Sequence, residues 1–275
     1  MIVRAPATSA NLGPGFDAAA VALDLWNELE VTDGEGVLVE GEGEDELPAD
    51  ATNLAVRAYA LRADPAGKRF RFVNRIPLER GLGSSAAAIA LGLAAAAPGA
   101  GPEELLADGR ALEGHADNLA AALSGGVTLT WDGRIARLAD GLPLAPVALV
   151  PRERTSTEAS RRSLPSTVSH ADAAANAAYA ALLAAGAAAQ DADLFAAGLD
   201  DRLHEPYRAP FVPLLDAVRG RLGGLPAYGA TISGAGPSVL VWCERGAADA
   251  VAQALADVAP RVLPLAVADA GVVVD

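Results

Sequence analysis

Residues 69–97 carry the pattern that most limits what this 275-residue chain can fold into: an alternating segment, a glycine-rich turn and an alanine-rich run. In "RFRFVNRIPL", Phe70 and Phe72 alternate with arginines, as in a half-buried β-strand. "RGLGSS" follows, and "AAAIALGLAAAA" then consists mainly of strong helix formers. The pattern predicts a strand, a tight turn and a helix in direct succession.

The rest of the chain predicts an α+β fold without internal repeats. Residues 18–31 are apolar without a clear period, so a strand and a helix both remain open there. Three prolines between residues 143 and 151 indicate a boundary between an N-terminal domain, 1–150, and a C-terminal domain, 151–275. We expect strands at about 37–40, 127–131, 145–150, 227–232, 239–242 and 261–267, and helices at about 52–64, 102–114, 171–186, 193–203, 210–222 and 247–259.

Composition excludes several classes of protein. A formal charge of −14 and an isoelectric point near 4.6 argue against nucleic acid as a partner, because such binding relies on clustered Lys and Arg. Cys243 is the single cysteine, and the chain shows neither a signal peptide nor a membrane span, so we expect a cytoplasmic protein without a membrane partner. Lys68 is the single lysine, which leaves a Walker-type GxxxxGK[ST] loop without a candidate.

The glycine-rich turn has two interpretations. Gly81, Gly83 and Ala86 match the G-x-G-x-x-A spacing of a dinucleotide-binding site. That site expects a strand with a terminal acid after the helix, whereas "GAGPEELLADGRALEG" is helical. Phosphate binding is favoured instead, because small residues, exposed backbone N–H groups and a helix N-terminus all suit an anion. Ser84 and Ser85 can add hydroxyl groups.

A nucleotide triphosphate would arrive with Mg²⁺, which prefers oxygen ligands. On the protein side, one serine hydroxyl and one carboxylate would suffice. Glu113 is the carboxylate we favour, since it ends the expected helix just before Gly114 and precedes the polar cluster "HADN". A helix C-terminus is electrostatically poor for an acid, which indicates that Glu113 has another task.

Four motifs occur in a specific order: "PATSANLGPGFD", "RIPLERGLGSSAA", "EGHADN" and "SGAGPS". Together they resemble the motif set of the GHMP kinase superfamily and, in their detailed wording, its homoserine kinase family. "STEASRRSLP" and "HEPYR" are similar to segments that line the amino-acid pocket of that family. The resemblance implies an α+β, two-domain GHMP kinase fold, with an N-terminal ATP-binding α/β domain and a C-terminal ferredoxin-like α/β sandwich.

The activity implied is ATP-dependent phosphorylation of the hydroxyl of L-homoserine, a step toward threonine, with ATP and Mg²⁺ as cofactors. A sister kinase acting on mevalonate or another small alcohol, and a non-catalytic relative that keeps the fold, are the alternatives. Related kinases commonly dimerise, so a homodimer is also open.

The resemblance also assigns roles to individual residues. Ser85 and Glu113 are implied as magnesium ligands, and Asp117 and Asn118 as groups that orient the substrate hydroxyl. Asn11, Asp17 and His115 are expected around the amino and hydroxyl ends of homoserine, with Thr157, Arg161 and Arg208 at its other end. The expected nucleotide-binding residues are Asn53 near the adenine, and Arg80, Gly81, Leu82, Gly83, Ser84, Ser85, Ala86, Gly234 and Gly236 around the phosphates.

Two positions depart from the family pattern. Glu79 and Arg80 stand where a glycine is common before the loop, and an acid so near to phosphate is unfavourable unless its side chain points away. Pro14 narrows the turn in the first motif.

Overall fold

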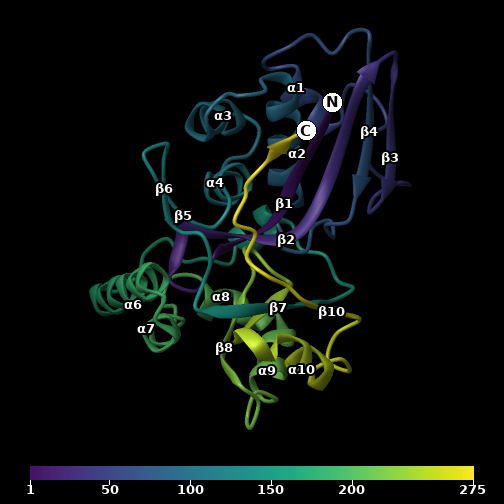
Figure 1. Ribbon diagram of the computed structural model, residues 1–275. Helices are drawn as coiled ribbons and strands as arrows, with labels where there is room; N and C mark the ends of the chain where they lie inside the picture. Colours follow the sequence, from purple (N-terminus) through teal and green to yellow (C-terminus); the bar gives the residue numbers. More distant parts are fainter.

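The computed structural model describes all residues, 1–275, and contains two β-sheets (Figure 1). The first sheet has seven strands, with β11-β1-β2-β4-β3 in order; β5 also pairs with β2, and β6 pairs with β5. Pairing is antiparallel except between β3 and β4. The strands are β1 (Ile2–Asn11), β2 (Gly15–Asp33), β3 (Gly36–Gly41), β4 (Lys68–Asn74), β5 (Val127–Trp131), β6 (Arg134–Ala139) and β11 (Val273–Val274).

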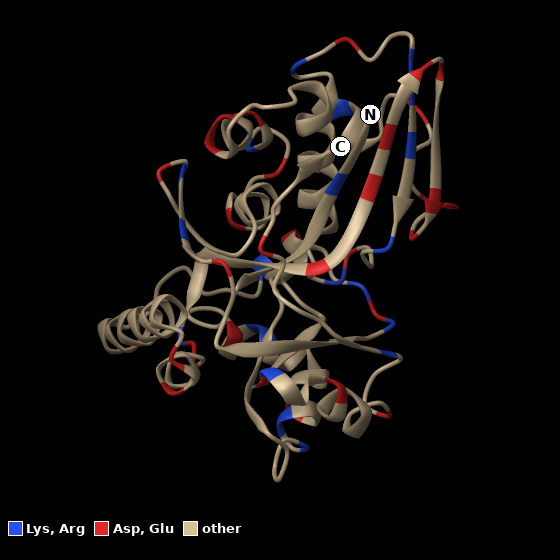
Figure 2. Ribbon diagram, viewed as in Figure 1, with Lys and Arg blue, Asp and Glu red and all other residues tan.

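Helices cover one face of this sheet, and the opposite face of strands β2, β3 and β4 carries charged side chains. Figure 2 shows acidic residues on strands β2 and β3 and basic residues on β4, which lies between them, and Arg71 of β4 pairs with Glu30 of β2 and Glu40 of β3. The covering helices are α1 (Leu54–Tyr59), α2 (Ser84–Ala96), α3 (Pro102–Gly109) and α4 (Asp117–Ser124).

Helix α2 lies in the centre of the core and is buried on almost all sides, which explains why its sequence lacks an amphipathic period. A side chain at Gly92 would come within 2.0 Å of the Ala55 carbonyl oxygen of α1, so this glycine permits close helix packing. The alanine-rich run that follows the glycine loop therefore fills the core, as expected.

The second sheet is antiparallel, in the order β10-β7-β9-β8. Helices α9 and α10 pack on one face of this sheet. On the opposite face, the ring of Phe195 in α7 packs edge to face against Trp242 of β9. The elements are β7 (Leu144–Val150), α5 (Thr157–Arg161), α6 (His170–Ala189), α7 (Ala192–Ala197), α8 (Glu205–Arg208), α9 (Pro213–Arg219), β8 (Ala227–Ile232), β9 (Val239–Glu244), α10 (Ala248–Ala254) and β10 (Arg261–Pro264).

Several expected elements change in extent. Residues 18–31 belong to the long strand β2, and the helix expected to reach Gly114 ends at Gly109. Strand β7 joins the second sheet and the C-terminal β11 returns to the first, so chain order and sheet membership do not divide at one residue. The division at residue 150 stays a prediction. None of the helices combines the length and the hydropathy that a membrane crossing requires.

Candidate active site

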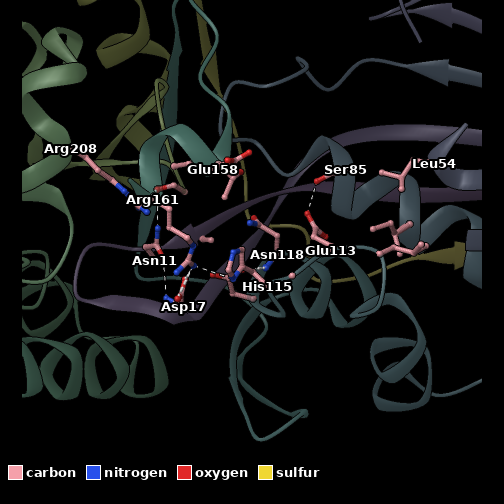
Figure 3. Close-up of a pocket in the computed structure, with 18 residues that line it drawn as sticks. Asn11, Asp17, Leu54, Ser85, Glu113, His115, Asn118, Glu158, Arg161 and Arg208 are labelled. Carbon is pink, nitrogen blue, oxygen red and sulfur yellow. Dashed lines mark hydrogen bonds and ion pairs between the residues drawn. The ribbon is translucent and has the colours of Figure 1, made fainter. Parts of the chain in front are cut away.

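A cavity of about 390 Å³ lies where the first motif, the N-terminus of α2, the 112–118 segment and helices α5 and α8 meet (Figure 3). It is the meeting point of side chains that are far apart in the sequence. The predicted residues that line it are Asn11, Asp17, Ser85, Glu113, His115, Asp117, Asn118, Thr157, Arg161, Arg208 and Gly234.

The glycine loop before α2 is held by direct backbone contacts with the other two glycine-rich segments. Gly83 is the N-cap of α2 at a φ of 67°, with no side-chain cap, and the first helical turn carries no acid. Gly81 has a φ of 75°, and a side chain there would come within 2.2 Å of the Ser233 carbonyl oxygen. The Ser233 hydroxyl donates to the Gly81 carbonyl oxygen at 2.6 Å. The first turn of α2 therefore presents backbone N–H groups and carries no acidic residue of its own, which fits a phosphate.

Gly83→Ala should destabilise the fold and open this loop. The new Cβ would lie 1.9 Å from Thr8 Oγ1, and rotating Thr8 away would break its 2.8 Å hydrogen bond to Asn118 Oδ1. With the positive φ, the expected loss is about 2–4 kcal/mol in the free energy of unfolding, measured by urea titration. Gly223→Ala is the control, since nothing lies within 4 Å of its Cβ position and its φ is not positive. Equal stabilities for the two variants would contradict this packing.

Glu113 faces Ser85 across the mouth of the loop. The Ser85 hydroxyl donates to Glu113 Oε1 at 2.5 Å, while Oε2 is buried and has no hydrogen-bond partner. Helix α3 ends at Gly109 and Glu113 lies in the following turn, so the expected position at a helix C-terminus was wrong. The unpartnered buried oxygen, rather than the helix dipole, indicates that this carboxylate awaits a cation or a proton.

The charge state of this part of the cavity is set by burial. Burial raises the pKa of Glu113 to about 7, against the opposing hydrogen bond from Ser85. Burial likewise raises the pKa of Asp117 to about 6, with the opposing hydrogen bond from the Asn118 N–H. No cluster of three or more His, Cys, Asp or Glu could hold a metal ion. Ser85 and Glu113 fit Mg²⁺ that takes its other ligands from phosphate and water.

These pKa shifts predict how stability depends on pH without ligands. Between about pH 4 and pH 7, Glu113 and Asp117 keep protons in the folded chain that they lose in the unfolded chain. Raising the pH through this window therefore favours unfolding through these two groups. Urea titrations should show a smaller decline in Glu113→Gln than in the wild type. A decline of the same size in both would contradict burial of an ionisable Glu113.

Opposite charges lie in contact at the other end of the cavity. A single Arg161 nitrogen, Nη2, donates to both Asp17 oxygens, at 2.6 and 2.8 Å, and lies 3.0 Å from His115 Nδ1 (Figure 3). Burial and the nearby Arg161 charge lower the pKa of His115, which favours the neutral ring. Asp17 and Arg161 were expected at opposite ends of the substrate, whereas the structure places the two side chains in direct contact. Their roles toward a substrate stay predictions.

A second arginine reaches the same place from α8. Arg208 is 3% exposed, and its Nη1 donates to the Gly234 carbonyl oxygen and to His204 Nδ1, both at 3.1 Å. The guanidinium carbons of Arg161 and Arg208 each lie 5.4 Å from the centre of the Phe16 ring. Each arginine also keeps a buried Nε without a partner. Two guanidinium groups with free donors in one cavity can bind a carboxylate.

Some predicted residues are engaged by the protein itself. Asn11 Nδ2 donates to the Gly234 carbonyl oxygen at 2.9 Å, and its Oδ1 accepts from the Asp17 N–H at 3.1 Å. Arg80 donates to the carbonyl oxygens of Leu78, Pro151 and Arg152, and Leu82 is fully buried. These contacts shape the loops that surround the cavity.

Asn53 lies in a neighbouring cavity of about 480 Å³, which shares Ser85 with the first. Its Oδ1 accepts from the Ala55 N–H at 3.0 Å and caps α1, while its Nδ2 donates to the Pro48 carbonyl oxygen. The Glu79 side chain is exposed, lines this second cavity together with Ser84 and Ser85, and lies 3.9 Å from Arg154 Nη1, so a cation accompanies this acid near the glycine loop.

Sequence reasoning missed several supporting residues. Phe16 lies under both arginines, and the buried His204 ring links Arg208 to the Gly13 carbonyl oxygen. Thr8 positions Asn118. Phe16 and His204 stand inside the "GFD" and "HEPYR" segments, but a single sequence gives no signal that separates them from core residues.

Comparisons with known proteins show the family of this chain. Residues 51–126 match the GHMP kinases N terminal domain, and residues 174–261 match the GHMP kinases C terminal domain. The homoserine kinase of Streptomyces coelicolor is 43% identical over 272 residues, which cover 90% of this chain and 86% of that protein. The homoserine kinase of Gloeobacter violaceus is 42% identical, with 95% and 93% covered.

Solved structures show the same fold. The crystal structure of homoserine kinase from Cytophaga hutchinsonii superimposes with a TM-score of 0.84 at 26% identity, covering 99% of this chain and 97% of that one. The structure of mevalonate kinase from L. major, at 15% identity and a TM-score of 0.71, shares the fold, with 97% and 94% covered.

Proposed function

This chain belongs to the homoserine kinases of the GHMP kinase family, and from that premise we propose how its residues transfer the γ-phosphoryl group of ATP to the hydroxyl of L-homoserine. The observation that carries the proposal is the contact between Asp17 and Arg161 inside a cavity that also reaches Ser85 and Glu113. One end of the cavity suits a zwitterion and the other suits a phosphate with its cation.

At the zwitterion end, the Asp17 carboxylate accepts from the α-ammonium group, and Arg161 and Arg208 donate to the α-carboxylate. The substrate thereby replaces the Asp17–Arg161 ion pair with contacts of the same charge pattern. The free Nε atoms of both arginines supply additional donors. The side chain of the amino acid then extends toward Asn118, which Thr8 holds in place.

At the phosphate end, Gly81–Ala86 contribute backbone N–H groups and Ser84 contributes a hydroxyl. Ser85 and Glu113 would hold Mg²⁺, which supplies charge neutralisation between the phosphates when bound. Phosphoryl transfer through a loose transition state asks mainly for in-line positioning and charge stabilisation, so we assign no general base. Asp117 and Asn118 orient the hydroxyl.

A substrate panel tests this function. We expect ADP release, followed with a coupled assay, to depend on magnesium and to be fastest with L-homoserine among homoserine, mevalonate, shikimate and galactose. The physical reason is that an alcohol without adjacent opposite charges leaves Asp17 and the two arginines without partners. Activity with mevalonate alone would support a sister kinase, and absence of magnesium-dependent ATP binding would support a non-catalytic relative.

A further inference from the structure

The cavity that holds Asn53 needs cations if it is to receive nucleotide phosphates, and few are available. Its lining includes two basic residues, Arg57 and Arg154. Arg80, the basic residue next to the glycine loop, already donates to three carbonyl oxygens. The one lysine, Lys68, pairs with Asp33. Arg57 and Arg154 are therefore the basic side chains of this cavity that could bind a phosphate.

Arg154 lies beside the entrance of the glycine loop. It stands between β7 and α5, and the N–H of the next residue, Thr155, donates to the Glu79 carbonyl oxygen at 3.1 Å. Glu79 precedes Gly81 by two positions, and Ser84 and Ser85 line the same cavity as Arg154. Arg57 has no comparable connection to the loop.

Arg154 now pairs with carboxylates, which a phosphate group could replace as its partner. Its two Nη atoms donate to the two Glu46 oxygens at 2.6 and 2.7 Å, and Nη1 lies 3.9 Å from Glu79 Oε2. The side chains of Arg154 and Glu46 are 41% and 42% exposed. Exposed pairs of this kind contribute little to stability, and the planar guanidinium group binds phosphate with the same two-pronged geometry as carboxylate.

We propose that Arg154 is a phosphate-binding residue. When the nucleotide enters, the Arg154 guanidinium group exchanges Glu46 and Glu79 for the β- and γ-phosphates as partners. This inference rests on the proposed function, because it takes ATP as the phosphoryl donor. The inference also explains the ion pair: the carboxylates of Glu46 and Glu79 hold the Arg154 guanidinium group near the glycine loop until a phosphate replaces them. It also places the phosphate contact on the segment that continues into Thr157 and Arg161 of the substrate cavity.

Calorimetric titration separates a phosphate contact from a structural role. In Arg154→Gln we expect the Kd of MgATP and of MgADP to rise about tenfold, because a hydrogen-bonded charge contact is lost, while the Kd of adenosine changes less than about twofold. Arg154→Lys should recover part of the MgATP affinity. Arg162→Gln is the matched control, since Arg162 lies on the same segment, is 69% exposed and pairs with Glu158. It should bind all three ligands like the wild type.

Two results would overturn the inference: unchanged MgATP affinity in Arg154→Gln, or equal losses for adenosine and MgATP, which would mean that Arg154 only shapes the cavity. Thermal unfolding of each variant establishes that it is folded. A wild-type protein that binds no MgATP would instead contradict the proposed function, so the two failures are distinguishable.

Discussion

Replacing Glu113 with glutamine should lower kcat by about 10³-fold at saturating magnesium, because several kcal/mol of charge stabilisation depend on a cation that the amide cannot hold. The fold should remain intact. In the ligand-free chain Glu113 Oε2 is buried without a partner, so removing its charge at pH 8 should leave the unfolding midpoint unchanged or higher. Catalysis and stability would then move in opposite directions, as expected of a functional residue.

The control for this experiment is Glu104→Gln. Glu104 is an exposed carboxylate on α3 that pairs with Arg62, and its loss should leave kcat within about twofold of the wild type. Isothermal titration of magnesium in the presence of ADP provides a second readout, in which Glu113→Gln should lose affinity. Near-normal turnover of Glu113→Gln at saturating magnesium would show that the metal assignment is wrong.

Replacing Arg161 with methionine should lower kcat/KM for L-homoserine by about 10³-fold, since the substrate carboxylate loses a charged donor and, in the free enzyme, Asp17 loses the partner that holds it in place. The loss should be far smaller for 3-aminopropan-1-ol, which keeps the ammonium and hydroxyl groups but has no carboxylate. The variant should therefore erase the preference for homoserine over this analogue. Arg162→Met, which removes the neighbouring exposed arginine, should retain the preference for homoserine over 3-aminopropan-1-ol.

A similar loss for both substrates in Arg161→Met would contradict the carboxylate contact and indicate a general disturbance of the cavity. The Asp17→Asn variant gives the complementary result. It should impair homoserine and 3-aminopropan-1-ol alike, because both carry the ammonium group. Steady-state kinetics with both alcohols, at fixed MgATP, measures these differences.

The sequence predicted the strand–turn–helix unit and the site around it because its chemistry depends on short local motifs. Gly81 and Gly83 need backbone conformations that glycine adopts readily, and small residues mark the start of α2. The ordered motifs then assign Ser85, Glu113 and Arg161 to one site, and the structure brings these residues into one cavity. Their roles there stay predictions, as does the homodimer.

The sequence could not predict features that depend on packing between distant segments. Residues 18–31 form a strand because β1, β4 and β5 all pair with β2, and none of these contacts is visible in the local pattern. The ion pair between Asp17 and Arg161 joins residues 144 positions apart. The stacking of Phe16 on His204, at 5.3 Å, likewise exists only once α8 packs against the first motif.

A one-pot competition tests whether this protein phosphorylates L-homoserine in preference to other small alcohols. The purified protein receives limiting MgATP with equal concentrations of L-homoserine, mevalonate, shikimate and galactose, and the products are identified by ³¹P NMR and mass spectrometry. We expect one dominant new phosphate monoester, on the side-chain hydroxyl of homoserine, formed in equal amount with ADP. A phosphorylated mevalonate, shikimate or galactose as the main product, or ADP without any new monoester, would contradict it.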